Sequence, residues 1–247
     1  MIDSLIDFVI KDSLHRPNDG HITCVVECLL DLNFVVDSSG SINFAHASNW
    51  NTSLQFVANV VRAFAIGPNS VQVAFVIFGN TARVEWGLTQ YRDQTSLVNA
   101  ILRVAYLGDD QQTNLAEGLY LTRTNVFASG RGSRANAAQV TVILTDGVDN
   151  VPDDRTPLTI QNATACKQAG ITLIAIGVTE SVDEARLRDI VTDRNTDYYA
   201  VSDFNALSNL VSKLRAQICV APPTGIRPHS TCPSSTLIAG FVAVEMP

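Results

Sequence analysis

The stretch Leu32-Asn33-Phe34-Val35-Val36-Asp37-Ser38-Ser39-Gly40-Ser41 joins a short apolar run to a polar loop. The run at 32–36 lacks the strict alternation of apolar and polar residues, as expected of a strand that is buried on both faces. Strands of this kind lie in the centre of a sheet. We therefore predict a central strand whose carboxyl end leads into a loop rich in carboxylate and hydroxyl oxygen.

Similar apolar runs alternate with stretches of helical periodicity along the chain. This alternation predicts an α/β fold with a doubly wound, mostly parallel central sheet and helices on both of its faces. Further buried strands are expected at 71–78, 140–144 and 171–178. Helices are expected at 51–65, 94–104, 115–127, 157–169, 182–191 and 206–218.

One further strand, at 82–88, should run antiparallel to its neighbour. It follows the strand at 71–78 after only Gly79-Asn80-Thr81, which is too short for the crossover that a parallel pair needs. The two strands should therefore form a hairpin at an edge of the sheet.

Both ends of the chain differ from this alternating pattern. Residues 1–15 have apolar side chains at helical spacing, which favours a short helix packed on its own domain over a partner-binding motif. Residues 220–236 contain four prolines among Ser and Thr and are typical of an irregular linker. We therefore predict an N-terminal flank at 1–28, one domain at 29–219 and a C-terminal flank at 220–247.

Composition argues against two classes of partner. The formal net charge is −7, the charged fraction is 17%, and no run of Lys or Arg is present, so nothing indicates nucleic-acid binding. The apolar stretch Leu237–Val244 is far shorter than the roughly 18 to 20 residues of a membrane-spanning helix. No signal peptide is visible at Met1–Asp7, so we interpret the chain as a mature form or a fragment.

Oxygen-bearing side chains follow two of the predicted strands and precede one helix. Asp37, Ser39 and Ser41 follow the first strand, Asp146 follows the strand at 140–144, and Thr113 stands before a helix. In open α/β sheets, ligands bind at the carboxyl ends of the strands. Such donors suit Mg²⁺, which prefers oxygen ligands and needs only one or two carboxylates. Taken alone, Asp37 and its serines would equally serve turn and helix-cap hydrogen bonds.

In these three segments the sequence closely resembles the von Willebrand factor type A family. That family has an Asp-x-Ser-x-Ser motif after its first strand, a Thr from a middle loop and an Asp after its fourth strand, which together form a metal-ion-dependent adhesion site. The resemblance covers roughly residues 30–219 and includes Phe78-Gly79, Ala175-Ile176-Gly177-Val178 and a strand at Tyr199. It implies the Rossmann-like fold of the family.

The resemblance also implies a site and a function. Its metal ligands would be Asp37, Ser39, Ser41, Thr113 and Asp146, with Mg²⁺ as the ion and Mn²⁺ or Ca²⁺ as alternatives. One coordination position would stay open for an acidic side chain of a protein partner, such as collagen or another matrix protein. The implied protein is an extracellular, secreted matrix or adhesion module.

Catalysis is the less favoured interpretation. The sequence lacks the Gly-x-Ser-x-Gly elbow of serine hydrolases, a phosphate-binding loop and a dinucleotide-binding glycine motif. Its histidines, which a nucleophilic serine would need as a base, lie outside any recognisable triad. These are His15, His21, His46 and His229. We therefore predict that the protein is not an enzyme.

The five cysteines are too widely spaced for a tetrahedral zinc site. Extracellular members of the resembled family often join the two ends of the domain, which implies a disulfide between Cys28 and Cys219. Cys24 and Cys232 would then form a second pair, and Cys166 would be a buried free thiol. In a cytosolic member of the family, all five would instead be reduced.

Two sequons, at Asn51 and Asn162, would accept glycans if the chain is secreted. Two other functions stay open at this point. One is a structural matrix scaffold that assembles through its flanks and helix faces, with the metal only stabilising its loops. The other is an intracellular scaffold, which reduced Cys28 and Cys219 would favour.

Overall fold

The computed structural model describes residues 28–219, apart from residues 45, 109–111, 148–155 and 180–181. The helix expected within 1–15 and the proline-rich stretch at 220–236 lie outside the described residues. The same holds for Cys24 and Cys232.

The described residues form a six-stranded sheet with the strand order β3-β2-β1-β4-β5-β6. All neighbouring strands are parallel except β2 and β3, which are antiparallel. The mostly parallel sheet with an antiparallel edge strand is therefore confirmed. The strands are β1 (Leu30–Asp37), β2 (Val71–Phe78), β3 (Ala82–Trp86), β4 (Ala138–Thr145), β5 (Thr172–Val178) and β6 (Tyr198–Val201).

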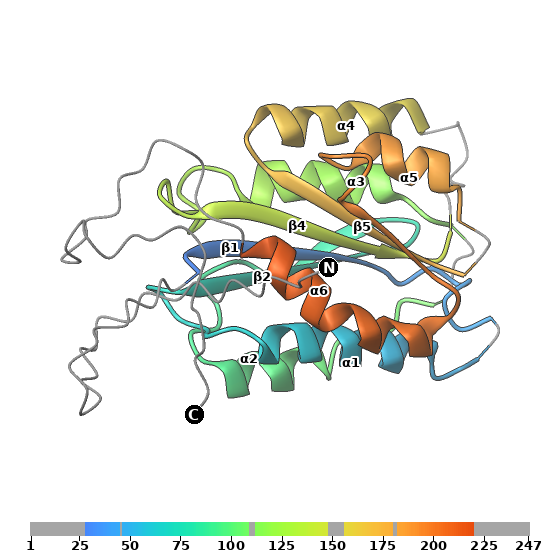
Figure 1. The fold of residues 1–247 in the computed structure, drawn as a ribbon, viewed down its shortest axis with the longest axis horizontal. Coiled ribbons are helices and arrows are strands. Elements are labelled where there is room, and N and C mark those ends of the chain that lie inside the picture. The colour runs from blue at the N-terminus through green and yellow to red at the C-terminus, as the bar shows by residue number, and fades with distance from the viewer. Residues whose placement is uncertain (1–27, 45, 109–111, 148–155, 180–181, 220–247) are drawn as a thin grey trace, which may run out of the picture.

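Helices cover both faces of the sheet (Figure 1). One layer contains α1 (Asn49–Arg62), α2 (Gln94–Ile101) and α6 (Val211–Ile218), and the other contains α3 (Leu115–Leu121), α4 (Thr156–Gln168) and α5 (Glu184–Ile190). Two shorter helices are η1 (Thr122–Val126) and η2 (Phe204–Leu210). No helix among the described residues is long and apolar enough to cross a bilayer.

The central strand β1 separates two hydrophobic cores. All of its residues are buried, as expected of a strand with a neighbour on each side and a helix layer on each face. Phe34 and Val36 pack with the α1 layer, whereas Val35 between them packs with the α3 layer. This alternation fixes the strand in place and therefore fixes where its last residue, Asp37, lies.

Two segments expected as single helices are composite. The segment at 115–127 changes from α3 to the π-helix η1, in which the Phe127 amide donates to the Thr122 carbonyl at 3.0 Å. The buried Thr122 hydroxyl donates to the carbonyl of Gly118 at 2.9 Å and accepts from Asn33 Nδ2 of β1 at 3.0 Å. The segment at 206–218 begins as the 3₁₀ helix η2 at Phe204 and continues as α6. Helical periodicity alone does not separate these helix types.

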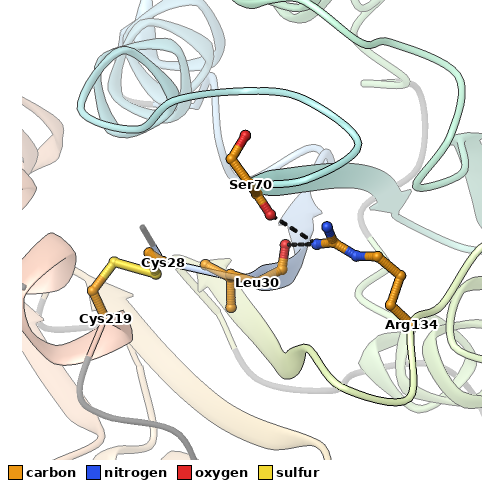
Figure 2. Close-up of a disulfide and its surroundings, with 5 residues drawn as sticks. All are labelled: Cys28, Leu30, Ser70, Arg134 and Cys219. Atoms are coloured by element: carbon orange, nitrogen blue, oxygen red, sulfur yellow. Dashed lines mark hydrogen bonds between the residues drawn. A yellow bond between two sulfur atoms is a disulfide. The ribbon is translucent and has the colours of Figure 1, made fainter. Parts of the chain in front are cut away.

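A disulfide joins the start of β1 to the end of α6, between Cys28 and Cys219, whose Cα atoms are 5.6 Å apart (Figure 2). Close by, the Arg134 guanidinium donates to the carbonyls of Leu30 at 2.6 Å and Ser70 at 2.9 Å. Arg134 also pairs with the buried carboxylate of Asp31 at 2.7 Å. The pairing of Cys28 with Cys219 therefore agrees with the sequence-based prediction, and Cys166 is free and buried, as predicted.

The two sequons differ in their surroundings. Asn51 is exposed on α1. Asn162 is partly buried on α4, and its Nδ2 donates to the carbonyl of Ala116 at 3.0 Å. Glycosylation of either residue stays a prediction.

Candidate metal centre

Three segments meet at the carboxyl edge of the sheet. Strands β1 and β4 are parallel neighbours, and their register pairs Val36 with Leu144. Asp37 is the last residue of β1, with Ser39 and Ser41 just beyond it, and Asp146 directly follows β4. The third segment delivers Thr113 immediately before α3, whose first turn is capped by the Asn114 side chain at Glu117 N.

Asp37 is fully buried, and both of its carboxylate oxygens accept hydrogen bonds. Oδ1 accepts from the backbone amide of Ser39 at 2.9 Å, and Oδ2 accepts from the hydroxyl of Thr145 at 2.6 Å. The first bond closes the loop back onto its own strand, and the second joins β1 to β4. These two bonds fix the orientation of the carboxylate.

Ser39, Ser41 and Asp146 form a continuous chain of side-chain contacts. The hydroxyl oxygens of Ser39 and Ser41 are 3.0 Å apart, and the Ser41 hydroxyl donates to Asp146 Oδ1 at 2.8 Å. The loop after β1 and the residue after β4 are therefore in direct contact, although 105 positions separate Ser41 from Asp146 in sequence.

Thr113 is buried at the same place. A Cβ atom on Gly147 would lie 3.7 Å from Thr113 Oγ1 and 3.9 Å from Ser41 Oγ, so both hydroxyls flank the same glycine. The structure thus gathers all of the side chains predicted as metal ligands at one edge of the sheet. They are Asp37, Ser39, Ser41, Thr113 and Asp146.

The two carboxyl groups are electrostatically unfavourable neighbours. Burial, followed by the negative charge of Asp146, raises the pKa of Asp37 from its ordinary 3.8 to about 7, against the hydrogen bonds from Ser39 and Thr145. Burial also raises the pKa of Asp146, which the hydrogen bond from Ser41 opposes. A cation between these groups would favour the ionised form of both.

Residues outside the predicted set support the site. The Ser38 hydroxyl accepts from the Leu107 amide at 2.8 Å, and the Tyr106 hydroxyl donates to the Ser39 carbonyl at 2.7 Å. The ring of Trp50 lies 5.6 Å from that of Tyr106. These contacts anchor the segment before Thr113 on the loop after β1. Sequence reasoning singled out neither Tyr106 nor Thr145, although Thr145 directly precedes Asp146.

The donor set fits a hard divalent cation. All of the gathered donors are carboxylate or hydroxyl oxygens, which Mg²⁺, Mn²⁺ and Ca²⁺ accept, whereas zinc is more often bound by Cys and His. Within the described residues, no group of three or more His, Cys, Asp and Glu side chains could hold a metal ion. A cation at this edge would therefore depend on the hydroxyl oxygens as well as on the two carboxylates.

Among the described residues at this edge, the side-chain hydrogen bonds of Ser39 and Ser41 involve each other and Asp146, and none involves a histidine. His46 lies in the same connection between β1 and α1 and is exposed. The histidines at 15, 21 and 229 lie outside the described residues.

Comparison with known proteins identifies the family of this chain. The family model of the von Willebrand factor type A domain matches residues 31–213. The collagen alpha-1(XII) chain of Notophthalmus viridescens is 31% identical over 222 residues, which is 89% of this chain and 22% of that protein. Matrilin-1 of Mus musculus is 31% identical over 77% of this chain and 36% of its own length. The chain therefore spans well under half of the length of these relatives.

Solved structures show the same fold. Proximal thread matrix protein 1 from the mussel byssus superposes with a TM-score of 0.70 at 27% identity, over 80% of this chain and 48% of that one. A second structure of the mussel protein, with a zinc-occupied MIDAS motif, has a TM-score of 0.70 at 28% identity over the same shares of both chains. From the match over 31–213, the shared fold and the arrangement of the site, we conclude that this chain belongs to the von Willebrand factor type A domain family.

Proposed function

We propose that this chain is a non-enzymatic binding module of the extracellular matrix, which binds protein ligands through a divalent cation. The observation that carries the proposal is the convergence of two carboxylates and three hydroxyls at the carboxyl edge of the sheet. The module would comprise residues 29–219, with flanks at 1–28 and 220–247. Its disulfide and its similarity to collagen XII and matrilin-1 support an extracellular location.

The five side chains would have different roles in binding the cation. Ser39, Ser41 and Thr113 would offer hydroxyl oxygens, and Asp146 would supply negative charge beside Ser41. Asp37 already accepts two hydrogen bonds, so it would act mainly by orienting Ser39 and by its charge. Mg²⁺ is the proposed ion, since it is satisfied by few carboxylates and retains water, and Mn²⁺ is chemically close to it.

The cation would supply an attractive charge at a position open to the partner. Two carboxylates neutralise a divalent ion only formally, so it can still attract an acidic side chain from another protein. No covalent bond is made or broken in such binding. Collagens and other matrix proteins are the partners that we propose to test, because the similar proteins include a collagen chain and matrilin-1.

The test is binding of the purified chain to immobilised collagens and other matrix proteins, in Mg²⁺ and in EDTA. Asp146→Ala removes the charge beside Ser41, and Asp189→Ala is the matched control, because it removes an exposed carboxylate on α5. We expect binding that EDTA and Asp146→Ala abolish and that Asp189→Ala preserves.

Binding that survives both EDTA and Asp146→Ala would overturn the proposal. It would favour a structural scaffold that assembles through its flanks and helix faces. A reduced Cys28 and Cys219 in the native protein would favour an intracellular scaffold instead. The melting temperature of each variant verifies that loss of binding is not loss of the fold.

A further inference from the structure

A large apolar side chain close to the candidate metal centre is exposed to solvent. Phe44 is 87% exposed, more than any other large apolar side chain that the structure describes, of which the next is Tyr120 at 49%. Phe44 belongs to neither of the two hydrophobic cores. Its exposure therefore has no explanation in the packing of the domain.

The backbone that presents Phe44 is fixed by hydrogen bonds. The Phe44 amide donates to the Ser41 carbonyl at 2.9 Å. Between them, the carbonyl of the buried Ile42 accepts from Asn49 Nδ2 at 2.9 Å, and Asn43 Oδ1 accepts from the Trp50 amide at 2.9 Å. Hydrogen bonds thus tie this turn to the start of α1 and support the backbone at Phe44.

Phe44 is also close to the metal centre. A turn closed by a bond between its first carbonyl and its fourth amide keeps the end Cα atoms within about 7 Å. Ser41, the first residue of this turn, contacts both Ser39 and Asp146. A partner whose acidic group reached the cation would therefore have its neighbouring residues within reach of the exposed Phe44 side chain.

We propose that Phe44 is a second contact of this site and makes it selective for acidic side chains that have an apolar side chain close by in the partner. The inference rests on the proposed function and specifies its ligand. Rigidly held aromatic residues are frequent among the few side chains that dominate binding energy, because they bury a large apolar area at little cost in entropy.

The geometry also indicates the spacing of the two groups in the partner. In an extended segment, alternate residues point to the same side and lie about 7 Å apart along the chain. This is close to the largest separation of the Ser41 and Phe44 Cα atoms that such a turn allows. The partner segment should therefore have an apolar residue two positions before or after its Asp or Glu.

The test is selection from a phage-displayed peptide library that has a fixed central Glu between randomised positions, with Mg²⁺ present. The selection uses the full chain, Phe44→Ser, Asp146→Ala and, as the matched control, Tyr120→Ser. Tyr120 is the next most exposed aromatic residue and lies on α3, in the opposite helix layer. Phe44→Leu tests whether an apolar side chain of another shape suffices.

We expect the unmodified chain and Tyr120→Ser to select apolar residues two positions from the Glu. Phe44→Ser should lower that enrichment roughly tenfold while binding stays sensitive to EDTA, and Phe44→Leu should retain most of it. Equal selection by the unmodified chain and Phe44→Ser would overturn the inference while leaving metal-dependent binding intact. Equal selection by the unmodified chain and Asp146→Ala would instead overturn the proposed function, and the inference with it.

Discussion

The hydroxyl of Thr145 donates a hydrogen bond of 2.6 Å to Asp37 Oδ2 and so joins the ends of two neighbouring parallel strands. Both residues are buried. Asp37 precedes the loop that contains Ser39 and Ser41, and Thr145 precedes Asp146. Together with the bond from Ser41 to Asp146, the bond from Thr145 to Asp37 therefore positions the two halves of the candidate metal centre relative to each other.

Replacing Thr145 should weaken cation binding although we do not propose its side chain as a ligand. Thr145→Val keeps the shape of the side chain but cannot donate to Asp37, so we expect Mg²⁺ affinity to fall by roughly 10-fold to 100-fold, as for other residues that orient metal ligands. Thr145→Ser restores the donor and should restore most of the affinity. Isothermal titration calorimetry with Mg²⁺ measures the affinity of both variants. An unchanged affinity in Thr145→Val would show that the bond does not position the site.

Cation affinity should depend on pH. Because the pKa of Asp37 is raised to about 7 by burial and by Asp146, a proton must leave before a cation is held well. Affinity should therefore fall as the pH drops below about 7, approaching a limit of roughly tenfold per pH unit for one displaced proton. Repeating the Mg²⁺ titration between about pH 5 and pH 8 measures this slope, and a flat profile would contradict it.

The same raised pKa should affect the stability of the metal-free protein. The folded state holds a proton on Asp37 at pH values where the unfolded chain, with a pKa near 3.8, has released it. Stability contributed by this group should therefore decline as the pH rises from about 4 to about 7. The free energy of unfolding should decline less over this range in Asp37→Asn than in the unmodified chain, both measured in EDTA. An equal decline in both would contradict the prediction.

The disulfide between Cys28 and Cys219 should stabilise the whole domain. It closes a loop with a sequence separation of 191 residues, and restricting the unfolded chain to this extent contributes about 5 kcal/mol in the loop-entropy model. The Cys28→Ser, Cys219→Ser double variant should lose about this free energy of unfolding in urea. A loss below about 1 kcal/mol would show that other contacts, such as those of Arg134, are enough to hold the two ends of the domain.

Gly118 should be intolerant of substitution because α3 lies close to β1. A Cβ atom at this position would be 3.0 Å from Val35 Cγ1, which is buried. We expect Gly118→Ala to destabilise the domain by about 1 to 3 kcal/mol, as overpacking of a core does. Gly87→Ala is the matched control, since nothing lies within 4 Å of a Cβ atom there. Equal stability of the two variants would contradict this account of the α3 packing.

Much of the fold was predictable from the sequence because the buried strands are continuously apolar. The strand predicted at 71–78 has those bounds in the structure, and the hairpin with β3 followed from a connection too short for a crossover. The composite helices were not predictable, because the change from α3 to η1 occurs at Thr122, where a hydrogen bond arrives from Asn33, 89 positions away in the sequence.

The candidate site was predictable in its members but not in its connections. Carboxylates and hydroxyls that follow parallel strands must meet at one edge of the sheet, and the family resemblance selected the relevant ones. The contacts of Ser38 and Tyr106 join segments that lie far apart in sequence. The exposure of Phe44 follows from a turn in which Ile42 points inward and Phe44 outward, and no sequence pattern distinguishes these two apolar residues.

The central claim is that a divalent cation is held among these oxygen donors. Diffraction at the manganese absorption edge, from crystals of the full chain grown in MnCl₂, tests it most directly. The account predicts an anomalous peak at the carboxyl edge of the sheet, in contact with Ser39 Oγ and Ser41 Oγ, which Asp146→Ala removes. Crystals with no peak at this edge, or with manganese bound only elsewhere, would contradict it.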